Sequence, residues 1–352
     1  MVAFRHLVHS LDPNEGGVSS SVYSLNHALN ELGVTSILCD NPKSINTTQL
    51  SVRALNVVHG LWHWPSRLAQ TKKSKTQNPY LIFPHGMLDP WFQKTYPWKH
   101  IKKQLYWWII EHMAIKQADA VCFTTHEEMK LARNTFTPYK ANEKVVGLGV
   151  DNPPVENLLI RSTLIQRFPS LNGRKILLYL GRFHEKKGLD MLLHAWVQNQ
   201  SQETMLVLAG PNHERTAYVR KLENLGEKNK HDILWTGMLD VHEKWEMIRM
   251  SDSLILPSHQ ENFGMVVAES LALGKPVYIT NRVNLWREVQ QANAGMVVND
   301  DQEGVNSLVN QWLTQSNTEI RKAAEPCFLQ NFHIRKAAEN LITLSENIYS
   351  SS

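Results

Sequence analysis

Short apolar runs along the chain alternate with longer segments in which apolar residues recur every three or four positions. The short runs end at glycine, proline or polar residues, which is typical of buried parallel strands. The longer segments have the spacing of helices that bury one face. This alternation predicts an α/β protein built on parallel sheets. We expect strands at 4–9, 35–39, 56–59, 118–125, 144–150, 175–180, 205–209, 233–235, 254–256, 277–279 and 295–298, and helices that include 18–32, 98–117, 127–133 and 264–273.

One strand, loop, helix and strand unit, residues 253–280, places two carboxylates close together in sequence. Glu261 lies in the loop after the first strand, and Glu269 lies about a turn and a half inside the helix. Open α/β sheets bind their ligands at the carboxyl ends of strands, so both carboxylates are candidates to hold one ligand. The alternative is a solvated loop glutamate followed by a glutamate on a helix surface.

Three backbone amides between these carboxylates add a second feature. Asn262, Phe263 and Gly264 come at the start of the helix, where free amides suit a phosphate or the oxygens of a sugar. Glycine at 264 lets a ligand approach the backbone closely.

The same unit resembles a known motif. It is similar to the E-x7-E signature of retaining glycosyltransferases of family 4, which have the two-domain GT-B fold. The resemblance implies that Glu261 binds hydroxyls of the transferred sugar and that Glu269 binds the ribose of a sugar nucleotide. It rests on Pro257, Ser258, Glu261, Phe263, Gly264, Glu269, Ala272, Gly274, Pro276 and Val277.

A second candidate site follows the strong strand at 175–180. Arg182 offers a planar fork for phosphate oxygens and Lys187 a mobile point charge. Two cations at a strand end are able to neutralise a diphosphate leaving group, although a solvated basic turn is the alternative. The segment from Gly181 to Gly188 resembles the family's G-R-x-x-x-x-K-G element, whose arginine and lysine bind the donor diphosphate.

The first half of the chain carries weaker candidates. Gly16 and Gly17 stand between a strand and a helix, where either a phosphate site or an ordinary turn is expected. His85 follows an apolar strand directly, and Asp89 is close enough in sequence to join it or to form a turn with Pro90. The resemblance implies that the glycine loop faces the donor diphosphate and the acceptor, and that His85 lies near the transferred sugar.

Met238 follows the strand at 233–235, in a loop that in related enzymes contacts the nucleobase, mostly through backbone atoms. The resemblance therefore places Met238 in the donor site, although a turn or packing role is equally open.

Residues 65–116 differ in composition from the rest of the chain. They hold nine basic and two acidic residues, a local net charge of +7, whereas the net charge of all 352 residues is +4. Seven aromatic rings from Trp91 to Trp108 lie among these charges. Basic residues beside aromatic rings suit an anionic bilayer surface, so one hypothesis is that this segment docks on a membrane. The alternative is an ordinary amphipathic helix over 98–117, with Ile101, Leu105, Trp108, Ile109 and His112 facing the core.

The composition excludes several classes of protein. No nucleic-acid module accompanies the basic segment, so we expect no nucleic-acid partner. Cys39, Cys122 and Cys327 are widely spaced, and neither a disulfide framework nor a metal cluster is indicated. The first residues lack a leader peptide and no run is long enough to span a bilayer, so we expect a cytoplasmic protein, at the inner face of the plasma membrane if the basic segment docks there.

The resemblance implies the GT-B fold: two Rossmann-like α/β domains whose parallel sheets face a central cleft. We expect domains at 1–152 for the acceptor and 174–333 for the nucleotide sugar, a linker at 153–173 marked by Pro153 and Pro154, and a final helix at 334–352 that returns to the first domain.

The expected activity is that of a retaining, metal-independent glycosyltransferase of the hexosyltransferase type, with a UDP- or GDP-linked sugar as co-substrate and no other cofactor. The implied acceptor is a glycan or lipid-linked sugar in bacterial surface polysaccharide (exopolysaccharide) assembly. The alternatives are a nucleotide-sugar epimerase, a phosphorylase that uses pyridoxal phosphate, and a non-catalytic scaffold of a polysaccharide assembly complex.

Overall fold

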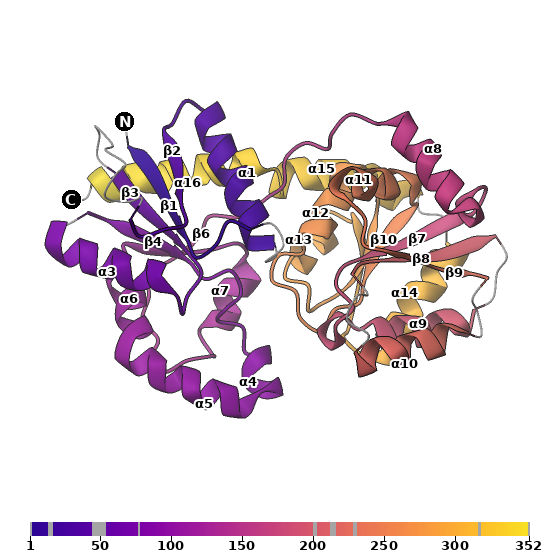
Figure 1. Cartoon of the computed structure of the whole chain (residues 1–352), viewed down its shortest axis with the longest axis horizontal. Helices are drawn as coiled ribbons and strands as arrows, with labels where there is room; N and C mark the ends of the chain where they lie inside the picture. Colours follow the sequence, from indigo (N-terminus) through magenta and orange to yellow (C-terminus); the bar gives the residue numbers. More distant parts are fainter. Residues whose placement is uncertain are drawn as a thin grey trace. The chain divides into compact units, whose positions relative to one another are not determined.

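The computed structural model describes residues 2–12, 17–43, 54–76, 78–199, 203–211, 216–227, 231–315 and 318–350. The chain forms two compact units, each with its own parallel sheet (Figure 1). Unit 1 consists of Met1–Asp151 together with Asn331–Ser352, and unit 2 consists of Asn152–Gln330. The prediction of an α/β protein with two parallel sheets is confirmed.

Unit 1 is built on a six-stranded sheet in the order β2-β1-β3-β4-β5-β6, and all neighbouring strands are parallel. The predicted strand at 144–150 is shorter than expected, because the chain leaves the sheet after Val145 and only Val150 pairs again, with His333. The strands are β1 (Ala3–Val8), β2 (Ser36–Cys39), β3 (Ala54–His59), β4 (Tyr80–Phe83), β5 (Ala120–Phe123) and β6 (Glu143–Val145).

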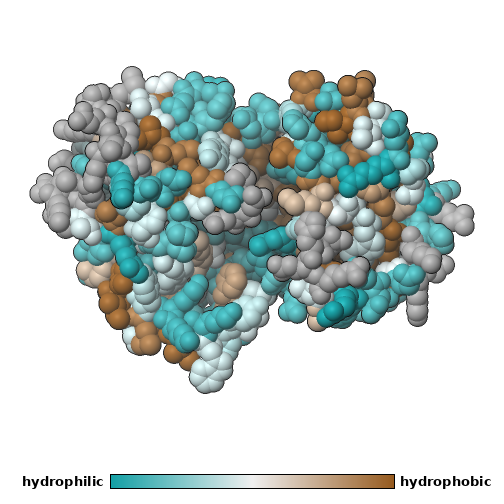
Figure 2. Space-filling model, in the orientation of Figure 1, coloured by the Kyte–Doolittle hydropathy of each residue, from teal (hydrophilic) through white to brown (hydrophobic). Residues whose placement is uncertain are grey.

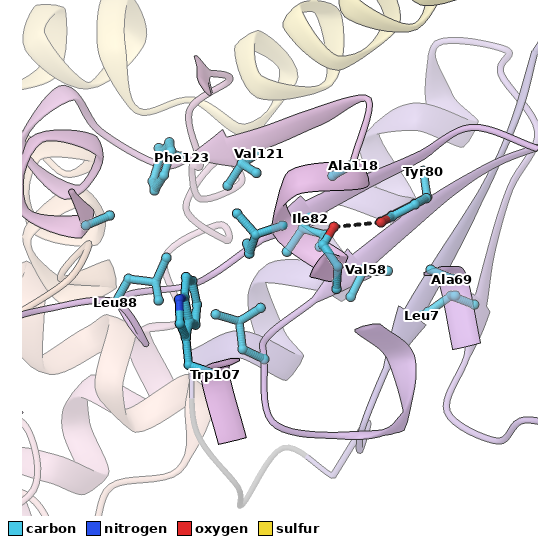
Figure 3. Packing of buried hydrophobic residues seen from close by; sticks show 14 of the residues in the cluster. Leu7, Val58, Ala69, Tyr80, Ile82, Leu88, Trp107, Ala118, Val121 and Phe123 are labelled. Carbon is cyan, nitrogen blue, oxygen red and sulfur yellow. Dashed lines mark hydrogen bonds between the residues drawn. The ribbon is translucent and has the colours of Figure 1, made fainter. Parts of the chain in front are cut away.

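Helices cover both faces of this sheet, because successive strand residues point to opposite sides. In β4, Leu81 and Phe83 pack in the core that contains α1 (Gly17–Glu31) and α16 (Ile334–Ser350). Tyr80 and Ile82 face the opposite core, shown in Figure 3, which includes α3 (Trp64–Thr76) and α6 (His112–Gln117). There the Tyr80 hydroxyl donates to the carbonyl of Ala114 at 2.6 Å. A further helix, α7 (His126–Ala132), follows β5.

The expected helix over 98–117 is divided into α5 (Pro97–Tyr106), the π-helical turn η2 (Trp107–Glu111) and α6, and a short helix α4 (Trp91–Thr95) precedes it. The side chains that turn inward are Trp107, Glu111, Ala114 and Ile115. The alternative prediction, that the apolar stripe of this helix faces the core, is therefore wrong. Four of its five side chains are exposed to solvent, and the fifth, His112, is only half-buried. The exposed four are Ile101, Leu105, Trp108 and Ile109.

Unit 2 is built on a second parallel sheet, in the order β12-β11-β10-β7-β8-β9. The strand order reverses between β7 and β10, which are neighbours although a large part of the unit separates them in sequence. Such a switch point is where open α/β sheets bind ligands. The strands are β7 (Lys175–Leu180), β8 (Thr204–Ala209), β9 (Ile233–Gly237), β10 (Ser253–Leu256), β11 (Val277–Thr280) and β12 (Gly295–Val298).

Helices lie on both sides of this sheet, with α9, α10 and α14 on one side and α8 and α11 on the other (Figure 1). None of the helices within the described ranges combines the length and the apolar character needed to cross a membrane. The helices and 3-10 turns of unit 2 are α8 (Leu158–Arg167), η3 (Pro169–Leu171), η4 (Glu185–Lys187), α9 (Leu189–Val197), α10 (Ala217–Gly226), α11 (Val241–Met250), α12 (Met265–Ala272), α13 (Trp286–Gln291), α14 (Gln302–Thr314) and α15 (Thr318–Asn331).

The segment expected to be a linker, 153–173, differs from that expectation because it contains helix α8 and is part of unit 2. Asn157 caps α8 by accepting hydrogen bonds from Leu159 and Ile160. The amide of Asn157 itself donates to the buried carboxylate of Glu246 on α11, at 2.8 Å. The contact with Glu246 attaches the segment to α11, and the proline pair lies at the start of the segment.

Candidate active site

Two loops leave the switch point of unit 2 side by side, one from β7 and one from β10. The amide of His259 donates to the carbonyl of Lys186 at 2.8 Å and joins them. Gly188 lies against Pro257, so closely that a β-carbon on Gly188 would be 2.1 Å from the Pro257 carbonyl oxygen. Gly188 also has a left-handed backbone with φ of +64°. Only glycine combines that conformation with such a contact.

This contact brings together two of the predicted site residues. The Lys187 ammonium and a carboxylate oxygen of Glu261 form a hydrogen-bonded ion pair, and both side chains are largely buried. Burial lowers the pKa of Lys187, and the neighbouring cations Lys186 and Arg182 lower it further, to about 7. A diphosphate bound here would favour the charged form of Lys187.

The lowered pKa predicts a pH dependence of nucleotide binding. Above pH 7 the free protein loses the charge of Lys187, so binding of a nucleoside diphosphate must then take up a proton. We expect the Kd to rise by roughly tenfold between pH 7.5 and 9, where the charge of the phosphate is constant. Isothermal titration with UDP and GDP measures this. Lys187→Arg keeps its charge and should show a flat profile; an equally flat profile in the unchanged protein would contradict the assignment.

The backbone of Glu261 is held on both sides by the loop after β11. Its amide donates to the carbonyl of Arg282 at 3.0 Å, and its carbonyl accepts from the amide of Asn284 at 3.1 Å. Gly264 then begins α12 with φ of +75°, and a β-carbon there would press on the side chain of Glu261 at 3.2 Å. These contacts give the Glu261 carboxylate a defined position before any ligand arrives.

Asn262 and Phe263 lie between these two residues. Phe263 is buried, and the side-chain oxygen of Asn262 is buried without a hydrogen-bond partner among the described residues. An unpaired buried oxygen is costly, so this atom is available to a ligand that donates a hydrogen bond.

Glu269 also pairs with a lysine, and the sequence did not indicate this partner. One carboxylate oxygen accepts from the ammonium of Lys244 on α11 at 2.6 Å. The other oxygen is buried and has no hydrogen-bond partner within the described part of the chain. The sequence feature that comes closest to indicating Lys244 is the spacing of Asp240 and Glu243. These two residues form a capping box, which places the start of the helix that contains Lys244 just after β9.

The remaining predicted residues of unit 2 are more exposed. Arg182 follows β7 and points into solvent, while its carbonyl accepts from the hydroxyl of Tyr179 at 3.0 Å. Met238 follows β9 and is also exposed. Both residues lie at carboxyl ends of strands, the edge of the sheet that carries Lys187 and Glu261.

In unit 1, His85 lies in the turn after β4 with φ of +52°, and its ring nitrogen Nε2 is 2.9 Å from Nδ1 of His59. No pattern in the sequence indicated that a buried carboxylate holds this turn. Glu128 accepts from the amide of Gly86 at 2.6 Å and from the amide and hydroxyl of Thr124. Burial raises the pKa of Glu128, and these donors oppose that rise.

Two of the three other predicted residues of unit 1 can be placed. Gly17 is the first residue of α1, where its carbonyl accepts from the hydroxyl of Ser21 at 2.6 Å, while Gly16 lies outside the described residues. Asp89 accepts from the amide of Trp91 at 2.8 Å, the arrangement of a turn.

Comparison with known proteins gives a match to one family. The model of the family "Glycosyl transferases group 1" matches residues 161–325. Spore coat protein SA of Bacillus subtilis is 25% identical over 189 residues, which are 50% of this chain and 50% of that protein. D-inositol 3-phosphate glycosyltransferase of Xylanimonas cellulosilytica is 29% identical over 174 residues, 47% of this chain and 42% of that protein. The chain thus spans about half the length of the curated relatives it matches.

Solved structures resemble the chain over nearly its whole length. Sucrose-phosphate synthase from Thermosynechococcus elongatus has a TM-score of 0.77 at 18% identity and covers 99% of this chain and 100% of its own. HepE from Anabaena, in complex with UDP, has a TM-score of 0.75 at 16% identity and covers 98% and 100%. At these identities the likeness shows the fold, and it confirms the prediction of the GT-B class.

Proposed function

We propose that this chain transfers a sugar from a nucleotide-diphosphate sugar, UDP- or GDP-linked, to a glycan or lipid-linked acceptor with retention of configuration. Residues 161–325, which match the model of the glycosyl transferases group 1 family, support this proposal. The observation that carries this proposal is the Lys187–Glu261 ion pair at the switch point of unit 2. Glu269, on α12 of the same unit, has one buried carboxylate oxygen without a hydrogen-bond partner among the described residues. HepE, a protein of the same fold, was crystallised with UDP, UDP and glucose, and UDP-glucose.

Each residue has a proposed role in binding the donor. Arg182 and Lys187 neutralise the diphosphate as its charge develops, and Glu261 with the Gly264 amide orients the sugar. The unpaired oxygen of Glu269 accepts from a ribose hydroxyl, while Lys244 holds the carboxylate in place. These cations supply the positive charge without a metal ion.

Unit 1 is the proposed source of the acceptor-side contacts. His85 contacts the transferred sugar, and Gly17, at the start of α1, contacts the acceptor. Both follow strands at the carboxyl edge of the sheet, where ligands bind in open α/β folds.

The proposed mechanism is displacement on one face of the sugar. Retaining hydrolases use a carboxylate as nucleophile, but here Glu261 is paired with Lys187 and Glu269 with Lys244, which favours binding roles for both. The departing phosphate oxygen then takes the proton of the acceptor hydroxyl as the new glycosidic bond forms.

The test is turnover of a panel of UDP-, GDP- and ADP-sugars, each with and without a membrane lipid extract, followed by release of nucleoside diphosphate. Release that requires the extract supports a transferase with a lipid-linked acceptor. Conversion of the sugar without any acceptor would instead identify an epimerase, and absence of donor binding would identify a scaffold.

The proposed biological setting is bacterial surface polysaccharide assembly at the inner face of the plasma membrane. One relative, 28% identical over 208 residues, is named as a protein in the cps region of Klebsiella pneumoniae. An exposed apolar stripe on unit 1 supports the membrane part of the proposal: Trp98 is 80% exposed and Ile109 is 77% exposed. Figure 2 shows hydrophobic side chains along the lower edge of unit 1, where Figure 1 places α5.

Lysines flank this stripe, and their charge favours an anionic surface. The stripe consists of Trp98, Ile101, Leu105, Trp108 and Ile109. The exposed lysines beside it are Lys94, Lys99, Lys102, Lys103 and Lys116. We therefore propose that α5 and η2 lie in the headgroup region of a bilayer, with the rings at the depth of the interface.

Binding to vesicles tests this surface. Co-sedimentation should be strong with phosphatidylglycerol vesicles and weak with phosphatidylcholine vesicles, and Trp98→Ser with Ile109→Ser should weaken it by at least about tenfold. Leu158→Ser with Leu159→Ser is the matched control, because these side chains are similarly exposed but lie on α8, whose own ten residues include no lysine. Equal loss in both double variants would exclude a specific docking face.

A further inference from the structure

Three histidines from three neighbouring strands of unit 1 form one hydrogen-bonded row. His6 lies in β1, His59 ends β3 and His85 follows β4. Nδ1 of His6 is 2.8 Å from Nε2 of His59, and Nδ1 of His59 is 2.9 Å from Nε2 of His85. The rings lie 5.1 and 5.2 Å apart, with planes inclined by 26° and 23°. Each contact therefore joins two nitrogens, of which one donates and the other accepts.

The members of the row are neutral at pH 7. His6 and His59 are buried, and His85 is half-buried. Burial lowers the pKa of His6 to about 3 and that of His85 to about 4. Burial also lowers the pKa of His59, and the neighbouring histidines lower it further. Each ring at neutral pH thus carries one proton, and that proton resides on either Nδ1 or Nε2.

The inner end of the row decides which nitrogen that is. Nε2 of His6 is buried and has no hydrogen-bond partner among the residues that the structure describes. A proton there would leave a buried N–H donor unpaired, which native structures avoid more strictly than an unpaired lone pair. Nδ1 of His6 therefore carries the proton and donates to His59. His59 in turn donates from Nδ1 to Nε2 of His85, and the proton of His85 is left on Nδ1.

We propose that His6 and His59 are positioning residues that hold His85 as a neutral imidazole with its proton on Nδ1, so that His85 presents a hydrogen-bond donor to the substrate. This inference rests on the proposed function for its ligand, an oxygen of the transferred sugar or of the departing phosphate. The contact with His59 uses Nε2 of His85, and no hydrogen bond to Nδ1 is formed within the described part of the chain. A donor at this position cannot take the acceptor's proton, which leaves that proton to the phosphate oxygen.

The turn itself is held independently of the row. The amide of Gly86 donates to Glu128 at 2.6 Å, so the backbone beside His85 stays in place when His59 changes. A substitution at His59 then alters the tautomer of His85 more than its position. His59→Asn keeps an N–H donor at the δ position, whereas His59→Leu removes it.

Two-bond proton–nitrogen correlation spectra of the intact protein, labelled with 15N-histidine, read the tautomer directly. His85 is assigned from the resonance lost in His85→Gln. We expect Nδ1 of His85 to be protonated and Nε2 unprotonated at pH 7 in the unchanged protein and in His59→Asn. A proton on Nε2 in the unchanged protein would overturn the proposal, even if His59→Leu fails to fold.

Turnover separates this inference from the function on which it rests. In His59→Leu we expect a mixed tautomer and a kcat lower by about tenfold or more, with the KM for the donor little changed and His59→Asn close to normal. Equal kcat in the two variants would overturn the link to catalysis. If the spectra show the predicted tautomer but the protein transfers no sugar, the proposed function is contradicted. The inference that the row sets the tautomer of His85 would still hold.

Discussion

Replacing Glu261 with alanine is expected to reduce sugar transfer by roughly 10²-fold or more while unit 2 stays folded. The carboxylate is the proposed contact to the sugar hydroxyls, and it is also the counter-ion of Lys187. Its loss leaves Lys187 largely buried without its acidic partner, so the pKa of this lysine falls further and less positive charge remains for the diphosphate. Lys187→Ala should therefore be about as damaging. Initial rates of nucleoside diphosphate release, with the donor that the panel identifies, measure both effects.

The double variant and one control make this test specific. Because Glu261 and Lys187 act as a unit, the double variant should lose little more activity than either single one. Glu185 lies in the same loop as Lys187 but is exposed, so Glu185→Ala should retain near-normal turnover. Near-normal turnover in Glu261→Ala, with unchanged thermal unfolding, would refute the assigned role.

Replacing Gly188 with alanine is expected to destabilise unit 2 by about 2–4 kcal/mol and to disrupt the donor site. The substitution adds strain to a left-handed backbone and places a methyl group against the carbonyl of Pro257. To make room, the loop after β7 must move away from the loop after β10, and that movement separates Lys187 from Glu261. Chemical denaturation measures the first effect, and UDP affinity measures the second.

Gly274 provides the matched control. It has φ of +66°, close to that of Gly188, but nothing lies within 4 Å of the position where a β-carbon would stand. Gly274→Ala should therefore cost only the backbone strain, about 1 kcal/mol, and leave UDP affinity unchanged. Equal losses of stability and of UDP affinity in the two variants would show that the contact with Pro257 contributes to neither.

Local patterns predicted most of the strands of the two sheets. Apolar runs that end at glycine or proline mark strands within a few residues, since burial and chain breaking are properties of the segment itself. The strands at 175–180 and 295–298 match the structure at both ends. The prediction failed where packing against another element decides whether a segment is helical. Residues 158–167 form a helix because α11 is available to cover them. The proline pair at 153–154 does not indicate this packing.

The exposed stripe of α5 and η2 is a second case in which the local pattern predicted an element but packing decided which of its faces is buried. The sequence indicated an amphipathic helix, but not what would cover its apolar side. Only the packed structure showed that Trp107 and Ala114 turn inward and that Trp98 and Ile109 remain outside.

The sequence by itself determined the fold class and the candidate residues Arg182, Lys187, Glu261 and Glu269, because each lies in a local motif that begins at the end of a strand. It did not determine their partners. The pairs of Lys187 with Glu261 and of Glu269 with Lys244, and the row from His6 to His85, join residues from different strands and helices. Such contacts follow from strand order and from close packing between loops, which are long-range properties that no local pattern records.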